Sequence, residues 1–280
     1  MAFADRLAAA IERAGTPACI GLDPVLERLP SDVSGVEPAD RICAFCGDII
    51  ESIVGTVAII KPQSACFERY GPPGLEALEA VCALARDAGM LVILDVKRAD
   101  IGVTAGHYAA AALGSGAQAV TLSPYMGRSS IEPFLDAGLG AFVLARTSNP
   151  DSDELQALTT GDGETLAERT AEMIRELGAR RLGLRGLSDV GAVVGITKSE
   201  AAERLREHMP RAPFLVPGFG AQGGSFDSVR PLLGERSLPG RGVIPTASRS
   251  ITYPDINFDW REAVREQAKI FADQAASAVA

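Results

Sequence analysis

The sequence lacks the features of a membrane protein and of a nucleic-acid-binding protein. No apolar run approaches the length of about 18 residues that a bilayer-spanning helix needs. Its 27 basic residues are outnumbered by 36 acidic ones, and the net charge of −9 disfavours a large phosphate-binding face. The segment 1–15 also lacks the basic start and cleavage site of a signal peptide. We therefore expect neither a membrane nor a nucleic acid as partner.

Cysteine and histidine are scarce as well. The five cysteines are odd in number and lie between positions 19 and 82, a pattern typical of free thiols in a reducing compartment. The two histidines, His107 and His208, lie far apart and indicate no metal cluster. These features predict a cytoplasmic protein and no metal ligands.

Lysine is rare in a chain that is otherwise rich in basic residues. Only four of the 27 basic residues are lysines, namely Lys61, Lys97, Lys198 and Lys269. Chance explains Lys269 in the last predicted helix. It is a weaker explanation for Lys61 and Lys97, because each of them ends an apolar predicted strand.

What the sequence does have is a regular alternation of short apolar runs and amphipathic segments. Strands are predicted at 18–22, 57–60, 91–96, 119–122, 141–145, 192–196, 214–216 and 242–246, and helical stretches near 3–14, 38–54, 73–88, 104–114, 129–137, 164–180, 198–208, 226–233 and 258–278. Eight such units predict an α/β fold, a (β/α)8 TIM barrel, over a single domain 1–280. The polar stretches 149–165 and 181–189 are interpreted as loop insertions.

The ends of the predicted strands carry most of the reactive side chains. In strand order these are Asp23, Lys61, Asp95 with Lys97, Ser123, 146–148, Thr197, 217–222 and Ser248 with Arg249. Active sites of such barrels lie at the C-terminal ends of the strands, so these side chains are expected around one mouth. Polar residues also begin many ordinary loops, so this pattern alone leaves both interpretations open.

The most informative stretch is LVILDVKRADIGVTAGHY, residues 91–108. The two-residue period of a strand places Asp95 and Lys97 on one face, Asp100 follows in the turn, and Thr104 is predicted to cap the next helix. An ion pair at the barrel rim would explain Asp95 and Lys97 alone. With Lys61 added, two lysines and two aspartates converge, which is more buried charge than stability explains and predicts a functional site.

A second stretch, FLVPGFGAQGG at 214–224, contains three glycines in the pattern G-x-G-x-x-G, at 218, 220 and 223. A dinucleotide-binding loop would require an acidic residue at the end of the next strand. That strand ends instead in Ser248 and Arg249, which suit a phosphate monoester. Phosphate binding is therefore favoured over a dinucleotide site and over a plain glycine-rich turn.

These residues resemble one known family. DVKRADIGVT resembles the D-x-K-x-x-D-I-x-x-T signature of the orotidine 5′-phosphate decarboxylases, and PGFGAQGG resembles their phosphate loop. Asp23, Lys61, the run 148–150 and Arg249 follow in the expected order, and the inserts and KPQSACFERYG are similar to the longer bacterial branch. Ser248 is a departure, because the shorter branch usually has glycine there.

The resemblance implies the decarboxylation, without a cofactor, of orotidine 5′-monophosphate to uridine 5′-monophosphate, the last step of de novo pyrimidine synthesis. It also implies a homodimer with shared active sites. Asp95 would face the substrate carboxylate, Lys97 would protonate C6, Lys61 would complete the charged network, and Asp100 would enter from the partner chain.

The resemblance assigns the remaining site residues to substrate binding. Asp23, Lys61 and Thr104 of the partner chain would hold the ribose hydroxyls, and Ser148 would contact the pyrimidine edge. Gln222 would bridge base and phosphate, with Pro217 and Arg249 beside it, and Ser248 would offer its backbone N–H.

Two alternatives stay open at this stage. The related sugar-phosphate decarboxylases and synthases share D-x-K-x-x-D but need Mg²⁺ and carboxylate ligands, whereas the second predicted strand here ends in Lys61 and Pro62. The second alternative is a sensor that binds a phosphate ligand without turnover.

Overall fold

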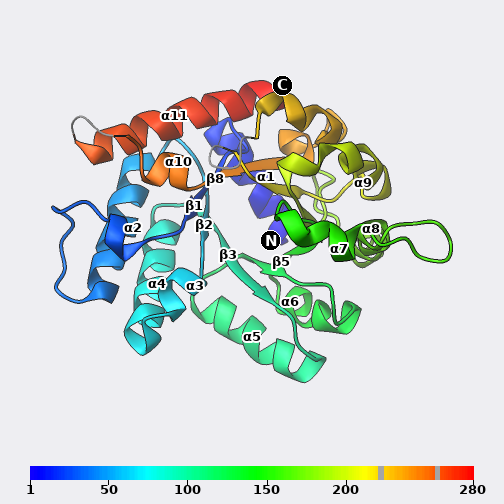
Figure 1. Ribbon diagram of the computed structural model, residues 1–280, viewed down its shortest axis with the longest axis horizontal. Coiled ribbons are helices and arrows are strands. Elements are labelled where there is room, and N and C mark those ends of the chain that lie inside the picture. The colour runs from blue at the N-terminus through cyan, green and yellow to red at the C-terminus, as the bar shows by residue number, and fades with distance from the viewer. Residues whose placement is uncertain (220–223, 256–258) are drawn as a thin grey trace.

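The structure is a computed structural model that describes residues 1–219, 224–255 and 259–280, apart from the side chains of 198–200. Eight parallel strands close into a barrel in sequence order (Figure 1). They are β1 (Cys19–Leu22), β2 (Ile59–Pro62), β3 (Leu91–Arg98), β4 (Ala119–Leu122), β5 (Gly140–Arg146), β6 (Val190–Val194), β7 (Phe214–Pro217) and β8 (Val243–Ala247). Each predicted strand overlaps an observed one, and the predicted (β/α)8 barrel is confirmed.

Helices surround the barrel. The longer ones are α1 (Phe3–Ala14), α2 (Pro38–Ile53), α4 (Gly71–Asp87), α5 (Gly102–Gly114), α6 (Glu132–Asp136), α8 (Leu166–Gly178), α9 (Ala202–His208) and α11 (Trp260–Val279). Single turns are α3 (Ala65–Glu68), α7 (Asp153–Gln156) and α10 (Arg249–Thr252), and 3-10 segments are η1 (Leu26–Arg28), η2 (Arg128–Ser130), η3 (Pro150–Ser152), η4 (Ile196–Ala201), η5 (Phe226–Leu232) and η6 (Pro239–Gly242). None of the helices described combines the length and apolarity needed to cross a bilayer.

One local prediction is wrong. Thr104 does not cap α5, because the helix begins two residues earlier, at Gly102. Ile101 occupies the cap position and makes no side-chain cap hydrogen bond. Thr104 is therefore a half-buried residue of the first helical turn, and its hydroxyl is not needed to start the helix.

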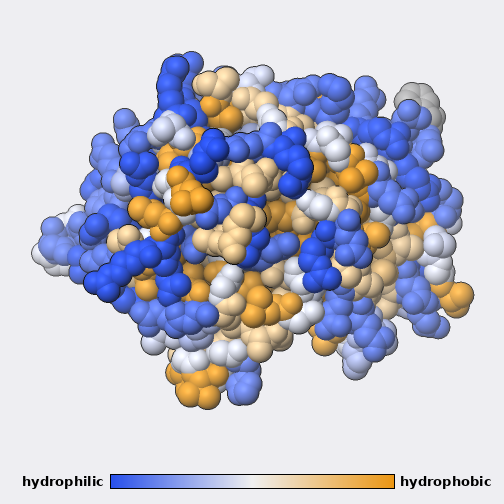
Figure 2. All heavy atoms as spheres, turned by 180° about the vertical axis from the view of Figure 1, so that it is seen from behind, coloured by the Kyte–Doolittle hydropathy of each residue, from blue (hydrophilic) through white to orange (hydrophobic). Residues whose placement is uncertain are grey.

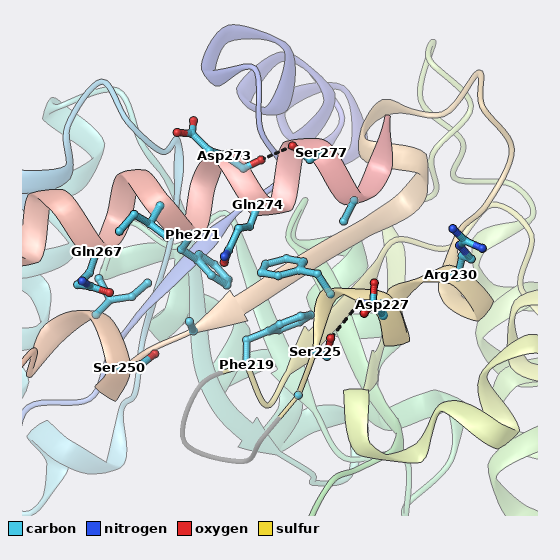
Figure 3. A pocket seen from close by; sticks show the side chains of 16 residues that line it. Phe219, Ser225, Asp227, Arg230, Ser250, Gln267, Phe271, Asp273, Gln274 and Ser277 are labelled. Atoms are coloured by element: carbon cyan, nitrogen blue, oxygen red, sulfur yellow. Dashed lines mark hydrogen bonds between the residues drawn. The ribbon is translucent and has the colours of Figure 1, made fainter.

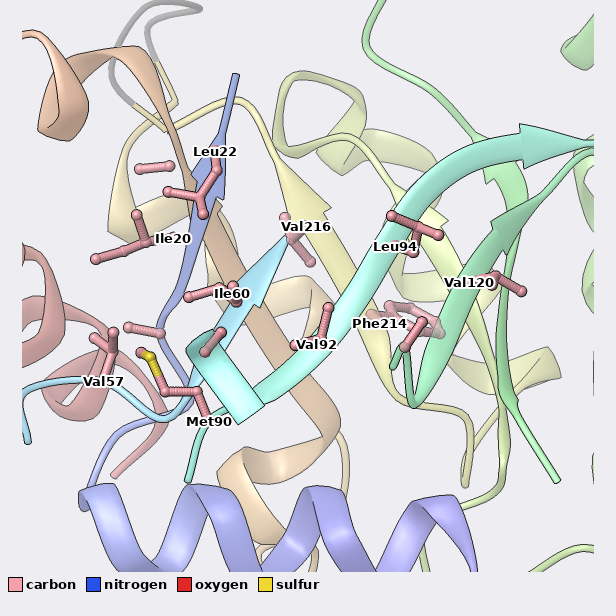
Figure 4. Packing of buried hydrophobic residues seen from close by; sticks show 14 of the residues in the cluster. Ile20, Leu22, Val57, Ile60, Met90, Val92, Leu94, Val120, Phe214 and Val216 are labelled. Atoms are coloured by element: carbon pink, nitrogen blue, oxygen red, sulfur yellow. The ribbon is translucent and has the colours of Figure 1, made fainter. Parts of the chain in front are cut away.

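The strands separate two apolar cores because successive side chains point to opposite faces. One set, which includes Ile20, Ile60 and Val92, packs between the barrel and its helices (Figure 4). The other set, which includes Ile59 and Ile93, fills the barrel interior together with residues of α1. Side chains that face inward at the C-terminal ends of the strands therefore meet one another.

Helix α1 closes the N-terminal end of the barrel. Phe3 and Leu7 are fully buried in the inner core, and the ring of Phe3 meets that of Phe142 edge-on at 5.9 Å between centroids. Gly140 is required beneath Phe3, since a Cβ there would lie 2.2 Å from the ring. The end of the barrel left for a ligand is the mouth at the C-terminal ends of the strands.

Seen from behind, hydrophilic side chains cover much of the surface, with apolar groups between them (Figure 2).

Candidate active site

Three adjacent strands place polar side chains in the top inward-facing layer of the barrel. Lys61 follows Ile59 on β2, Asp95 follows Ile93 on β3, and Thr121 lies two residues after Ala119 on β4. The period of two that points these apolar residues inward does the same for the polar ones. All three polar side chains are buried, with relative exposures of 7%, 5% and 1%.

The carboxylate of Asp95 is the centre of this group. Oδ2 accepts from Lys61 Nζ at 2.5 Å and from Gln63 Nε2 at 3.2 Å. Oδ1 accepts from Lys97 Nζ at 2.5 Å and from the Thr121 hydroxyl at 2.8 Å. We call these five residues the lysine–aspartate cluster. Two charged and two neutral donors together saturate the carboxylate.

Charge pairing outweighs desolvation in this cluster. Burial alone would raise the pKa of Asp95, but the charges of Lys61 and Lys97 and their hydrogen bonds hold that pKa well below its usual range. Burial alone would lower the pKa of Lys61, but the carboxylates of Asp95 and Asp23 hold it above its usual range. Asp95 and Lys61 are therefore both charged in neutral solution. With Lys97, the ammonium groups outnumber the carboxylate, so the cluster favours an anionic ligand.

Lys97 reaches Asp95 through a turn in the backbone, so simple alternation does not account for their contact. Its φ of 43° lies in the left-handed region, which is uncommon for a residue with a side chain. The side chain of Lys97 is 48% exposed, whereas that of Asp95 is 7% exposed. The ammonium of Lys97 is thus the part of the cluster most open to the mouth.

A pocket adjoins the cluster at Lys61 and extends to β7, β8 and β1. It is lined by Asp23, Lys61, Pro217, Gly218, Phe219, Thr246, Ser248 and Arg249. Asp23 Oδ1 and the Ser248 hydroxyl are buried there and have no hydrogen-bond partner among the described residues. Buried polar atoms are normally paired, so both are positioned to bond a ligand. We call this the binding pocket.

The glycine-rich stretch after β7 is described only in part. Gly218 has a φ of 114°, a backbone conformation that side chains disfavour, and the N–H of Gly224 donates to its carbonyl at 3.2 Å. Gln222, predicted to bridge base and phosphate, lies outside the described residues, as do Gly220 and Gly223.

Ser148 follows β5 in a loop that the first insertion holds in place. The side chain of Gln156 on α7 accepts from the N–H of Thr147 at 2.8 Å and donates to its hydroxyl at 2.9 Å. Arg146 Nη2 pairs with Asp153 Oδ1 at 2.6 Å. Ser148 itself packs closely against Gly195, because a Cβ on Gly195 would lie 2.7 Å from the backbone nitrogen of Ser148. The segment 150–156 therefore folds back on the loop that carries Ser148.

Asp100 and Thr104 are not brought into the cluster of their own chain. Asp100 Oδ1 accepts from the N–H of Ile101 at 2.8 Å, a contact within its own turn. Among the described residues, no ion pair joins Asp100 to Lys61 or Lys97. The expected convergence of two lysines with two aspartates therefore holds for Lys61, Lys97 and Asp95 within one chain and leaves out Asp100.

Two members of the cluster were not predicted. Gln63 follows the Lys61–Pro62 strand end, and Thr121 is the inward-facing residue just before the end of β4. Alternation along β4 places Thr121 on the inward face, but nothing in that pattern distinguishes it from Ser123 as the polar group at the end of the strand. Neither is charged, so a search for titratable groups passes over both.

A large cavity of about 830 Å³ lies outside the barrel mouth, between η5 and α11 (Figure 3). Its lining includes Phe219, Phe271 and Gln274. Phe219 also lines the binding pocket, but none of the predicted site residues that the structure describes lines this cavity. In the part of the chain that the structure describes, no three His, Cys, Asp or Glu side chains are grouped to hold a metal ion.

Comparison with known proteins identifies the family. Residues 16–257 match the Orotidine 5'-phosphate decarboxylase / HUMPS family. The chain belongs to this family. An orotidine 5'-phosphate decarboxylase of Rhodopirellula baltica is 44% identical over 272 residues, which cover 90% of this chain and 89% of that protein. One of Clostridium perfringens is 35% identical and covers 99% of both chains.

Solved structures agree with this assignment to the orotidine 5'-phosphate decarboxylases. The OMP decarboxylase of Leishmania donovani superposes with a TM-score of 0.82 at 32% identity, over 100% of this chain and 99% of that one. The family predicted from residues 91–108 and 214–224 is therefore confirmed.

Proposed function

We propose that this decarboxylase converts orotidine 5′-monophosphate to uridine 5′-monophosphate and CO₂, the last step of de novo pyrimidine synthesis, without a cofactor. The observation that carries the proposal is the Asp95 carboxylate held between the ammonium groups of Lys61 and Lys97 at a barrel mouth. Family membership and the names of the curated relatives support the same reaction.

The chemistry requires a fixed positive charge beside the reacting carbon. When the bond from C6 to the carboxylate breaks, its electron pair stays on C6, and the pyrimidine offers no electron sink comparable to a pyridinium ring. An ammonium already in position stabilises that pair electrostatically. Lys97 then gives a proton from Nζ to C6 and recovers one from water, while Lys61 and Asp95 keep its position and charge.

The binding pocket would hold the rest of the substrate. Asp23 would accept from a ribose hydroxyl through Oδ1, which has no partner in the described structure. Arg249 and Ser248 would bind the phosphate beside Pro217 and Gln222, and Ser148 would contact the pyrimidine edge. Binding energy from the remote phosphate would then favour closure of the surrounding loops and removal of water from around C6.

Asp100 and Thr104 would act in the site of a second copy of this chain. Ile101 and Val103, beside them in the sequence, are 59% and 79% exposed, and Tyr125 in the loop after β4 is 81% exposed. Gly102 lies against the carbonyl of Ser129, so the start of α5 and the loop after β4 share this surface. We infer a homodimer that covers it, in a single-domain cytoplasmic enzyme without membrane or nucleic-acid partners.

Subunit exchange tests the shared site. Homodimers of Lys97→Ala and of Asp100→Ala should both be nearly inactive. After mixing, each mixed dimer should have up to half the activity of a wild-type dimer. Activity returns because one of the two sites then contains both intact residues. Exchange verified by mass, with no activity regained, would show that each chain completes its own site.

The activity itself is tested by following the absorbance of orotidine 5′-monophosphate with the EDTA-treated protein. Steady conversion to uridine 5′-monophosphate is expected. Loss of activity with EDTA and its return with Mg²⁺ would instead indicate the metal-dependent sugar-phosphate chemistry. Tight nucleotide binding without turnover would indicate a sensor.

A further inference from the structure

The hydroxyl of Thr121 makes three hydrogen bonds, which use its full capacity. Its oxygen accepts from the backbone N–H of Val96 at 3.1 Å and of Lys97 at 3.0 Å. Its proton goes to Asp95 Oδ1 at 2.8 Å. One donor and two lone pairs are all that a threonine hydroxyl has. The side chain thus joins the backbone of Lys97 to the carboxylate that its own ammonium contacts.

The pairing of β3 with β4 explains why two successive amides need this oxygen. Leu94 pairs with Val120 and Arg98 with Leu122, so the three residues 95–97 of β3 stand opposite Thr121 alone. The two extra residues cannot use the regular ladder of carbonyls. These two amides are partly buried, and an unpaired amide shielded from water is unfavourable, so an acceptor from a side chain stabilises the bulge.

The same bulge contains the φ of 43° at Lys97. Backbone in that region is unfavourable for a residue with a Cβ and persists only where its surroundings hold it. The amide of Lys97 is held by Thr121, and this turn brings the ammonium back to within 2.5 Å of Asp95 Oδ1. Thr121 is not among the residues that line the binding pocket.

We propose that Thr121 is a positioning residue for the decarboxylation: its hydroxyl fixes the bulge of β3 that holds the Lys97 ammonium at the reacting carbon. This inference rests on the proposed function of Lys97. A misplacement of about 1 Å in a reacting group lowers a rate by about 10²-fold. Loss of the hydroxyl should therefore reduce kcat while leaving the affinity for nucleotide largely intact.

The test compares Thr121→Val, which keeps the shape and removes the hydroxyl, with Thr121→Ser, which keeps the hydroxyl. Thr170→Val on α8 is the matched control, because that hydroxyl donates to the carbonyl of Leu166 in its own helix. Thr121→Ala replaces the valine variant if the latter does not fold. The measurements are kcat and KM for orotidine 5′-monophosphate, the Kd of uridine 5′-monophosphate and the melting temperature.

We expect Thr121→Val to lower kcat about 10²-fold with the Kd changed less than about threefold, and Thr121→Ser and Thr170→Val to keep most of the wild-type kcat. A valine variant with wild-type kcat, a serine variant as impaired as the valine one, or a parallel loss of binding and kcat would each overturn the proposal. A merely structural role predicts a lower melting temperature with kcat retained.

A crystal structure of Thr121→Val separates this proposal from the proposed function. The Lys97 ammonium should move away from Asp95 whether or not the wild-type protein decarboxylates orotidine 5′-monophosphate. An unchanged bulge and an intact contact between Lys97 and Asp95 would overturn the role of Thr121. A wild-type protein without turnover would overturn the function instead.

Discussion

The two sides of the barrel mouth differ in how complete they are before a ligand binds. On the side of β2 to β4, both oxygens of Asp95 have two donors each. On the side of β7, β8 and β1, Asp23 Oδ1 and the Ser248 hydroxyl are buried without partners in the part of the chain that the structure describes. Lys61 belongs to both sides.

This difference separates the chemistry from the binding. Charges fixed before the reaction need no rearrangement when charge develops at the substrate, and this is where electrostatic catalysis gains most. Unpaired polar atoms favour a ligand that can bond them, because their desolvation has already occurred on folding. The lysine–aspartate cluster would therefore determine kcat, and the binding pocket would determine affinity.

The largest effect should come from Lys97→Ala, which removes the exposed ammonium of the cluster. Loss of a general acid and a charge stabiliser together should lower kcat by at least about 10³-fold. Nucleotide binding, measured as the Kd of uridine 5′-monophosphate, should remain detectable. Lys269→Ala, on the exposed face of α11, is the control and should keep wild-type activity. A Lys97→Ala enzyme with a tenth of wild-type kcat would remove this residue from the mechanism.

Asp95→Asn should show that the cluster is also needed for folding. Lys61 would be left buried without its carboxylate, and loss of one partner of a buried pair costs about 3 kcal/mol of unfolding free energy. Urea denaturation at neutral pH measures this difference, with Asp273→Asn on the exposed face of α11 as control. Equal stability of Asp95→Asn and wild type would show that the two ammonium groups do not need the carboxylate.

The same comparison depends on pH in a defined direction. Because Lys61 and Lys97 depress the pKa of Asp95 in the folded state, its charge stabilises the protein fully above the unfolded-state pKa of about 4. The stabilisation is lost as the pH falls below that value towards the folded-state pKa. The gap between wild type and Asp95→Asn should therefore narrow below about pH 4. A gap that stays constant down to pH 3 would contradict the depressed pKa.

Arg249→Ala should weaken the binding side. A hydrogen bond to a charged group is worth about 1.5–3 kcal/mol, so kcat/KM should fall about 10- to 150-fold. The loss should be small for the nucleoside orotidine, which has no phosphate. Arg265→Ala on α11 is a control outside the pocket. Equal losses on nucleotide and nucleoside would show that Arg249 does not contact the phosphate.

Ser248→Ala should have the smallest effect. It removes one hydroxyl from the pocket, and a single neutral hydrogen bond contributes about 0.5–1.5 kcal/mol. We expect KM to rise a few-fold with kcat unchanged, and no change for Ser250→Ala two residues later. A lower KM would show that the Ser248 hydroxyl hinders the ligand.

The sequence was sufficient for the features that follow from periodicity. Eight apolar runs predicted the barrel, and the ends of those runs predicted where Lys61, Asp95 and Ser248 would lie. Periodicity failed at the bulge of β3, where three residues stand opposite one. Thr121 and Gln63 contact Asp95 only in the folded structure, and no spacing within the sequence indicates these two contacts.

The proposed role of Asp100 in a partner's site could not be predicted from spacing either. Nothing in the alternation of strands and helices separates Asp100 from Asp95, and only the family resemblance assigned Asp100 to the partner's site. Within one chain, Asp100 bonds its own turn. Among the described residues it pairs with neither Lys61 nor Lys97, and this is the reason to propose that it completes the site of a second copy.

The most direct measurement of the central claim is a pair of crystal structures, one of the free protein and one with bound uridine 5′-monophosphate. We predict that the contacts of Asp95 with Lys61, Lys97 and Thr121 are the same in both, and that Asp23 and Ser248 gain hydrogen bonds only in the complex. A cluster that assembles only when the nucleotide binds, beside a pocket that is already paired without it, would contradict the account.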